Sequence, residues 1–367
     1  MIEGYELFMI RLPLVSPFRT SFGTETDKEC ILVRALTSDG HGWGECVASP
    51  DPGYSAEFNE SAWLVMRDHL IPSLLRDQPD AAGSPVAMEW VRGHPMAKAA
   101  LEMALLDAEC RAAGVSMSRR LGGVRREVEV GVSIGIQGSS AEMVARVAEH
   151  LEQGYRRIKL KIEPGADHEP VAAVREAFPD ILLSVDANGA YGPDDSPLFE
   201  SMEEFGLLMI EQPLEPPDLL GHARLQAKLR TRLCLDESVA SPEDAVAALE
   251  LEACRIINIK QGRVGGLLAG IAIHDLCREQ GVPVWCGGML ETGIGRAGNL
   301  ALASLPGFTL PGDISASARY FHEDLTEPFE VSAEGTMPVP TGPGLGVEPA
   351  AERLAAITVR QETIRKE

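Results

Sequence analysis

Short apolar runs alternate with amphipathic stretches along most of the chain. From VEVGVSIGI at 128–136 to VPVWC at 282–286, runs typical of β-strands are separated by segments whose apolar residues recur at helical spacing. A weaker eighth run lies near FTLPGD at 308–313. Eight strands alternating with helices predict an α/β fold, a (β/α)8 barrel of the TIM type.

The first part of the chain has a different pattern. YELFMIRLPL at 5–14 and ECILVRAL at 29–36 alternate as antiparallel strands do, and HGWGECVA at 41–48 indicates a third strand. Helical stretches follow, among them MAKAALEMALLDAECRAA at 96–113. A small sheet followed by helices predicts an α+β domain.

The tail of the chain is rich in proline and glycine between 335 and 349, so it cannot continue the barrel. We expect it to return and pack on the first domain. The predicted division is an N-terminal α+β capping domain at 1–125, completed by 325–367, and a barrel at 126–324.

Five charged residues end successive strand candidates of the predicted barrel, at steps of 25, 25, 25 and 24 residues. They are Lys161, Asp186, Glu211, Asp236 and Lys260. The C-terminal ends of barrel strands are where active sites are built. The two lysines end the second and sixth strands, which face each other across the mouth of a ring of eight, and the three carboxylates lie between them. This spacing predicts a catalytic site.

Three neighbouring carboxylates repel one another unless a cation neutralises them. Ligands that are all oxygen select a hard ion, Mg²⁺ or alternatively Mn²⁺. A substrate carboxylate on that metal would make the adjacent carbon acidic, and Lys161 could remove its proton. In the sequence KLK, Lys159 lies on the same strand face, where a second ammonium disfavours the charge of the first. With lysines on opposite sides of the site, a proton could leave one face of the substrate carbon and return to the other, which is racemisation. Alternatively, one lysine could remove a proton and help to expel a β-hydroxyl group, which is dehydration.

Each of these residues taken alone also has a structural explanation, such as a turn or a strand end, and only their joint spacing favours catalysis. Glu237 competes with Asp236 as a ligand, but Asp236 fits the register better. Gly293 to Gly298 match GxGxxG, a dinucleotide motif, yet the motif comes late and lacks an acidic residue about 20 positions further on. We therefore expect these glycines to shape a loop and a helix start. The eight histidines are scattered and receive no catalytic role.

Composition narrows the kinds of partner. The 33 basic and 55 acidic residues give a net charge of −22, which argues against nucleic acid or an anionic membrane. No apolar run approaches a membrane span, and no signal peptide is recognised. The seven cysteines contain no CxxC pair, which favours reduced thiols and a cytoplasmic enzyme.

Short motifs around the five residues resemble the enolase superfamily, in its muconate-lactonizing branch. These motifs are KLK, DAN, IEQP, LDES and NIK, in this order. Longer segments resemble the o-succinylbenzoate synthase / N-succinylamino acid racemase group of that superfamily. They are SPFRTSFGTE (16–25), WGECVA (43–48), GYRRIKLKIEPG (154–165), GRVGG (262–266), PVWCGGMLETGIGRAGNLALASLP (283–306) and PTGPGLGV (340–347).

The resemblance implies a capped barrel that binds Mg²⁺ through Asp186, Glu211 and Asp236. Lys161 would be the base that dehydrates 2-succinyl-6-hydroxy-2,4-cyclohexadiene-1-carboxylate to o-succinylbenzoate in menaquinone synthesis. Lys260 would stabilise the enediolate and act as second acid or base in racemisation. Racemisation of N-succinyl amino acids is the alternative or companion activity. Dipeptide epimerisation and cycloisomerisation are weaker alternatives, since the eighth-strand region holds Asp313 alone. A non-catalytic binding protein with this fold is a further alternative.

The resemblance also implies substrate contacts, a small-molecule carboxylate substrate and a homo-oligomer. The expected contacts from the capping domain are Phe18, Arg19, Ser21, Phe22 and Tyr54. Those from the barrel are Asn188, Arg263, Gly288, Met289 and Glu291. Arg263 is associated with racemase competence in this group. Gln261 departs from the proline usual in KPGRVGG, and beside Lys260 it could alter that loop and lower the efficiency of racemisation.

Overall fold

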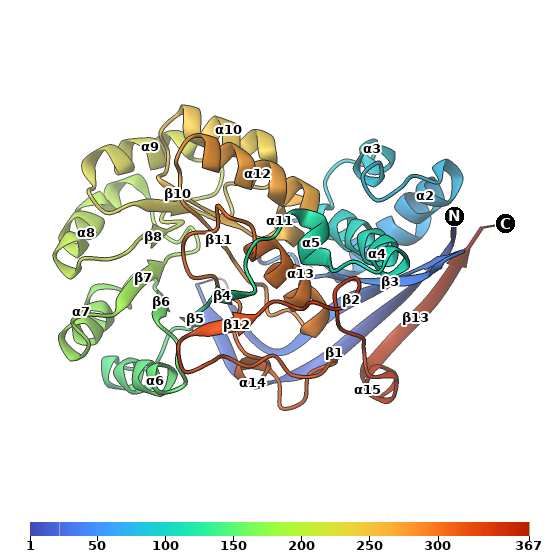
Figure 1. Ribbon diagram of the computed structural model, residues 1–367. Helices are drawn as coiled ribbons and strands as arrows, with labels where there is room; N and C mark the ends of the chain where they lie inside the picture. The colour runs from blue at the N-terminus through green and yellow to red at the C-terminus, as the bar shows by residue number, and fades with distance from the viewer. Residues whose placement is uncertain (22, 367) are drawn as a thin grey trace.

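Seven parallel strands form the curved sheet at the centre of the barrel in the computed structural model, which describes residues 1–21 and 23–366 (Figure 1). Their order is β11-β10-β9-β8-β7-β6-β5. The bounds are β5 (Gly131–Ile134), β6 (Arg157–Lys161), β7 (Leu182–Asp186), β8 (Ile210–Glu211), β9 (Leu233–Leu235), β10 (Ile256–Ile259) and β11 (Val284–Cys286). All their residues are buried except Leu182 at the start of β7, as expected for a parallel sheet covered by helices.

Helices follow the strands in the alternation that the sequence predicts. The long ones are α6 (Ser140–Glu152), α7 (His168–Ala177), α9 (Leu219–Lys228), α10 (Pro242–Glu250), α12 (Leu267–Glu279) and α13 (Gly293–Ala303). Shorter elements are η2 (Pro193–Asp195), α8 (Ser196–Ser201), η3 (Met202–Phe205), α11 (Gln261–Val264) and α14 (Ser317–Tyr320). Ser139 and Ser241 cap α6 and α10 by accepting hydrogen bonds from Glu142 N and Asp244 N. The predicted TIM-type barrel is confirmed.

The predicted eighth strand at 308–313 is reduced to two isolated bridges, Phe308 with Val284 and Gly312 with Val130. Pro311 lacks the N–H group that a regular ladder needs. The segment still joins the two edges of the sheet, because Asp313 N donates to Cys286 O at 2.9 Å and Gly131 N donates to Gly312 O at 2.6 Å. It therefore places Asp313 at the barrel mouth without forming a strand.

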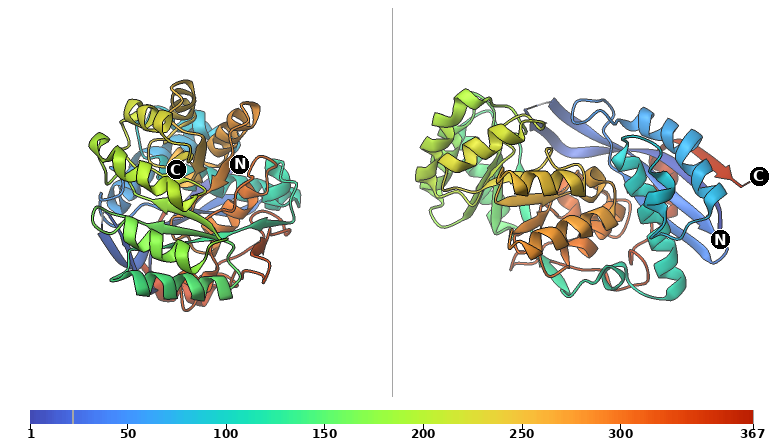
Figure 2. Two further views of the ribbon diagram at one scale, coloured as in Figure 1. Left: turned by 90° about the vertical axis from the view of Figure 1, so that its left-hand side faces the viewer. Right: turned by 90° about the horizontal axis from the view of Figure 1, so that it is seen from above.

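A four-stranded antiparallel sheet of order β13-β1-β2-β3 forms the cap beside the barrel (Figure 2). Its strands are β1 (Ile2–Thr20), β2 (Gly23–Thr37), β3 (Gly40–Cys46) and β13 (Thr358–Arg365). The cap helices are α1 (Asn59–Val65), η1 (Met66–Leu70), α2 (Ile71–Asp77), α3 (Ser84–Met88), α4 (Pro95–Ala113) and α5 (Met117–Leu121). The backbone of α4 lies so close to β3 that a Cβ at Gly42 or Gly44 would collide with it.

The last strand of the chain pairs with the cap sheet. β13 pairs with β1 from Gly4 to Ile10, and the two termini lie together at one end of that sheet (Figure 1). Before β13 come β12 (Thr336–Pro338), which pairs with β4 (Glu127–Glu129), and α15 (Ala351–Ile357). The residue boundaries of the two domains stay a prediction.

Two buried carboxylates of the cap bind the first turns of barrel helices. Glu45 on β3 accepts hydrogen bonds from Thr292 N at 3.0 Å and Gly295 N at 2.8 Å, at the start of α13. Glu102 on α4 accepts one from Leu268 N at 3.1 Å, at the start of α12. Since helix N-termini carry unpaired N–H groups and partial positive charge, these contacts fasten the cap to the barrel.

Candidate active site

The register of the barrel strands brings the predicted carboxylates together. Asp186 lies opposite Lys161 on the β6–β7 pair and opposite Glu211 on the β7–β8 pair, and Asp236 directly follows β9. One oxygen each from Asp186, Glu211 and Asp236 lies within 4.8 Å of the others, and all three residues are buried. Glu237 is not in this group; it accepts a hydrogen bond from Asn188 Nδ2 at 2.8 Å.

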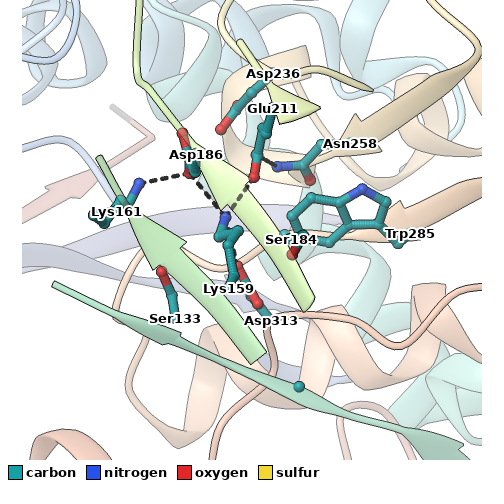
Figure 3. A network of polar contacts seen from close by, with 12 residues as sticks. Ser133, Lys159, Lys161, Ser184, Asp186, Glu211, Asp236, Asn258, Trp285 and Asp313 are labelled. Atoms are coloured by element: carbon teal, nitrogen blue, oxygen red, sulfur yellow. Dashed lines mark hydrogen bonds and ion pairs between the residues drawn. The ribbon is translucent and has the colours of Figure 1, made fainter. Parts of the chain in front are cut away.

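The two predicted lysines approach this carboxylate group from different strands. Lys161 Nζ lies 2.6 Å from Asp186 Oδ2 (Figure 3). The same Nζ lies 2.6 Å from Asn188 Oδ1. Lys260 Nζ lies 2.7 Å from Asp236 Oδ2. Lys161 ends β6 and Lys260 follows β10, so the pair stands on either side of the three carboxylates, as the spacing predicts.

Lys159 lies deeper than Lys161 and contacts more acids. Its Nζ is 2.6 Å from Glu211 Oε2, 2.9 Å from Asp186 Oδ2 and 2.7 Å from Asp313 Oδ2 (Figure 3). Burial lowers the pKa of Lys159, but the negative charges of Asp186, Asp313 and Glu211 outweigh burial and hold that pKa well above its ordinary value. Lys159 is therefore an internal counter-ion as well as the like-charged neighbour of Lys161 that the KLK pattern indicates.

The three carboxylates differ in how well their charges are balanced. Burial and the neighbouring charge of Asp186 raise the pKa of Glu211 well above its ordinary value. For Asp236, Lys260 and Arg263 outweigh burial and lower the pKa. An additional cation would therefore stabilise the charged form of Glu211 most. Three converging carboxylate oxygens, one of them from a residue whose charged form is poorly stabilised, fit a divalent metal ion.

A cavity opens above these residues, and we refer to it as the active-site cavity. Its lining includes the predicted contacts Phe18, Tyr54, Asn188, Gly288 and Met289 together with Lys159, Lys161 and Lys260. Tyr54 comes from the cap, and its hydroxyl lies 3.4 Å from Lys260 Nζ. Capping residues and barrel lysines thus border the same space.

Other predicted substrate contacts lie outside this lining in the described part of the chain. Arg19 pairs with Glu163 at 2.7 Å, and its side chain is 52% exposed. Arg263 is buried behind Asp236, forms an ion pair with it, and donates to Val239 O and Asn258 O at 2.8 and 2.6 Å. Ser21 and Glu291 also lie outside the lining, and Phe22 falls outside the described residues.

Several residues of the site were not expected to have a role there. Asn258 donates to Glu211 Oε1 at 2.8 Å, and strand alternation two residues before Lys260 could have indicated it. Asp313 is held by Arg157 and Lys159, whose charges outweigh burial and lower its pKa to about 2. Ser133, at the register position opposite Lys159, also lines the cavity.

The GxGxxG segment forms the start of α13, as expected, and the anion at this helix N-terminus comes from the protein itself. Glu45 accepts from Gly295 N, and Asp324 accepts from Gly293 N at 3.0 Å. A Cβ at Gly295 would lie 2.9 Å from Glu45 Oε2. Since Glu291 Cγ would lie 2.7 Å from the same Cβ, the glycine is explained by the close approach of the Glu291 and Glu45 side chains together.

Comparison with known proteins agrees with this geometry over most of the chain. Residues 5–122 match the mandelate racemase / muconate lactonizing enzyme N-terminal domain, and residues 142–353 match the family described as enolase C-terminal domain-like. The chain belongs to the enolase superfamily. Its resemblance to the o-succinylbenzoate synthase / N-succinylamino acid racemase group is also confirmed by relatives.

Relatives within this superfamily are similar over nearly their whole length. A protein of Amycolatopsis sp named N-succinylamino acid racemase is 54% identical, over 97% of this chain and 97% of that protein. A protein of Geobacillus kaustophilus named o-succinylbenzoate synthase is 48% identical, over 95% of this chain and 93% of that protein. A crystal structure of an enolase superfamily member from Listeria innocua superposes with a TM-score of 0.96 at 39% identity, covering 100% of this chain and 99% of that one.

The family is one of enzymes, so the alternative of a non-catalytic binding protein is not supported. Among the described residues, no helix is both long and apolar enough to span a bilayer.

Proposed function

We propose that this protein dehydrates 2-succinyl-6-hydroxy-2,4-cyclohexadiene-1-carboxylate to o-succinylbenzoate, a step of menaquinone synthesis, and that it can also racemise N-succinyl amino acids. The observation that carries the proposal is the pair Lys161 and Lys260 on either side of three buried carboxylates. The names of the relatives at 54% and 48% identity support the same two activities.

Asp186, Glu211 and Asp236 would hold the metal, and we propose Mg²⁺, with Mn²⁺ as the alternative. When bound, the ion supplies positive charge that makes the carbon beside the substrate carboxylate more acidic. The protein's part is to keep the three carboxylates converged. Lys159 and Asn258 do so by contacting Glu211 at 2.6 and 2.8 Å.

In the dehydration, Lys161 as a free amine would remove the proton from the ring carbon that bears the carboxylate. The carbon–oxygen bond at the neighbouring ring carbon then breaks, the ring becomes aromatic, and the proton on Lys161 leaves with the hydroxyl as water. Lys260 stays protonated and stabilises the negative charge that develops on the substrate carboxylate. Lys161 Nζ lies 2.6 Å from Asn188 Oδ1, so Asn188 would help to orient the base.

Racemisation would use the same cavity with both lysines changing protonation. One lysine removes the proton on carbon from its side, and the other returns a proton to the opposite face. The placement of Lys161 at the end of β6 and of Lys260 just after β10 favours this second activity. Dipeptide epimerisation is disfavoured, because Asp313 is paired with Arg157 and Lys159 and is not available to hold a substrate amino group.

The dehydration is tested by following absorbance of the cyclohexadiene carboxylate with Mg²⁺ and then with EDTA. We expect a kcat/KM within about 10⁴–10⁸ M⁻¹s⁻¹ that is lost on chelation. Lys161→Ala should abolish turnover, whereas Lys98→Met, in a cap lysine outside the active-site cavity, should not. Near wild-type dehydration by Lys161→Ala would contradict the mechanism.

We also propose that the protein is located in the cytoplasm and that it forms a homo-oligomer.

A further inference from the structure

A fourth lysine, contributed by the cap, lines the active-site cavity. Lys28 lies on β2 and is 4% exposed, and it borders the same cavity as Lys161 and Lys260. Its Nζ donates a hydrogen bond to the backbone carbonyl of Met289, at 2.9 Å, in the loop that follows β11. The ammonium therefore stands where the cap meets the barrel mouth, facing the space available to a substrate.

Lys28 differs from the other lysines of this cavity in its charge partners. Lys159, Lys161 and Lys260 each have a carboxylate oxygen within 3 Å. Within the described residues, Lys28 has no carboxylate oxygen within the 4.0 Å that defines an ion pair. An ammonium has three N–H groups, and the backbone carbonyl of Met289 takes one of them.

The nearest acids are engaged elsewhere or lie further away. Glu25, Glu45 and Glu291 influence Lys28 through charge, but none forms a salt bridge with it. Glu45 directs its two oxygens to Thr292 and Gly295 at the start of α13. Burial lowers the pKa of Lys28, but the neighbouring acids outweigh burial and raise that pKa, so Lys28 stays an ammonium. Because its one described hydrogen bond goes to a neutral carbonyl, this ammonium beside a substrate cavity can bind an anionic group of a ligand.

We propose that Lys28 binds the carboxylate at the far end of the succinyl group. This inference rests on the proposed function, because both proposed substrates carry a reacting carboxylate and a second carboxylate on a succinyl chain. The barrel lysines serve the reacting end, and Lys28 offers a cation from the cap side of the same cavity. Arg19, the cationic residue of the cap expected to contact substrate, pairs with Glu163 outside the cavity lining.

The test compares two ligands that differ in that carboxylate alone. The first is o-succinylbenzoate, and the second is 2-butanoylbenzoate, in which a methyl group replaces the distal carboxylate. Both are titrated by calorimetry, with Mg²⁺ present, into wild-type protein, Lys28→Met and Lys98→Met. Lys98 is the matched control, because its Nζ also donates to a single backbone carbonyl, that of Val91, but lies outside the cavity lining.

Wild-type protein and Lys98→Met should bind o-succinylbenzoate about tenfold to a hundredfold more tightly than 2-butanoylbenzoate, as expected for one hydrogen bond to a charged group. In Lys28→Met the two affinities should become nearly equal, while the affinity for 2-butanoylbenzoate stays unchanged. Lys28→Arg should restore part of the preference. In steady-state assays Lys28→Met should raise KM and leave kcat nearly unchanged.

Three results would overturn the proposal. The first is that Lys28→Met still prefers o-succinylbenzoate over 2-butanoylbenzoate as strongly as the wild type does. The second is that Lys28→Met binds both ligands more weakly by the same factor. The third is that wild-type protein binds both ligands equally well. Equal weakening would mean that Lys28 only positions the Met289 loop. Failure of the proposed function would look different, since turnover would be absent in the wild-type assay whatever the ratio of the two affinities.

Discussion

At the scale of single residues, the strand-end positions could be predicted and their supporting contacts could not. The spacing of 25 residues places Lys161, Asp186 and Glu211 at one edge because one strand, loop and helix take about that length. The same spacing carries no information about Lys28, which reaches the cavity from another domain. Nor does KLK reveal that Lys159 contacts three carboxylates, because that depends on Asp313 in the irregular closing segment.

Asn258 provides a prediction at this scale. Its Nδ2 donates to Glu211 Oε1, and a Cβ at Gly287 would lie 2.7 Å from that Nδ2, so the amide is confined. We expect Asn258→Ala to free one oxygen of Glu211 and to lower the affinity for Mg²⁺ about tenfold to a hundredfold, as is typical of residues that orient metal ligands.

The affinity is measured by calorimetric titration of Mg²⁺ into the apo-protein, with Gln153→Ala as a control, since that amide contacts His150 on the outer helix α6. Unchanged Mg²⁺ affinity in Asn258→Ala would show that Glu211 needs no such support. A loss of similar size in the control would indicate a general effect on folding.

At the scale of elements, the sequence pattern identifies strands and helices better than it identifies how the ring closes. Seven of the eight predicted barrel strands form, and all their residues except Leu182 become buried. The eighth predicted strand, at 308–313, does not form, because Pro311 interrupts the hydrogen bonds that a regular strand would make. Asp313 nevertheless places a charged residue at the end of this segment. Helix α13 shows a second limit, because its anionic partner Glu45 lies about 250 positions earlier.

Removal of that partner gives a prediction for α13. Glu45→Ala leaves Thr292 N and Gly295 N without their acceptor at a buried helix start, and it removes the acceptor of the Thr292 hydroxyl at 2.7 Å. We expect the free energy of unfolding to fall by roughly 1–3 kcal/mol, as for buried hydrogen-bonding groups left unpaired. Urea denaturation measures the change.

The exposed residue Glu152, at the end of α6, serves as the comparison for Glu45. Glu152→Ala should alter the free energy of unfolding by less than about 0.5 kcal/mol. If Glu45→Ala unfolds at the same urea concentration as the wild type, the contact between cap and barrel helix contributes no net stability.

At the scale of the whole molecule, the strand-end site follows from the barrel, whereas the cavity requires the cap as well. Phe18, Lys28 and Tyr54 come from the cap, and they meet Lys161 and Lys260 across the domain junction. Relative placement of two domains depends on buried polar contacts such as those of Glu45 and Glu102, which join segments remote in sequence. Sequence periodicity describes each domain and leaves their junction undetermined.

Buried titratable groups far from the site make the stability of the whole molecule depend on pH. Burial, reinforced by the positive charge of Arg319, lowers the pKa of His150 to about 4. A histidine whose pKa is lowered on folding contributes stability above its unfolded pKa of about 6.5, and this contribution is lost as the pH falls toward 4. Since each pKa unit corresponds to about 1.4 kcal/mol, the loss can reach about 3 kcal/mol.

Replacement of His150 by leucine should remove that pH dependence without adding a charge. We expect the free energy of unfolding to decrease less between pH 7 and pH 4.5 in His150→Leu than in the wild type, as measured by urea denaturation at both pH values. His322→Leu, in an exposed histidine just after α14, should follow the wild type. Glu57 acts in the opposite direction, because burial raises its pKa to about 7 and its contribution decreases as the pH rises from about 4.5 to 7. Because Glu57 contributes equally to the wild type and to His150→Leu, its effect cancels when the two proteins are compared. An equal change in the free energy of unfolding between pH 7 and pH 4.5 in both proteins would show that His150 is accessible to protons in the folded protein.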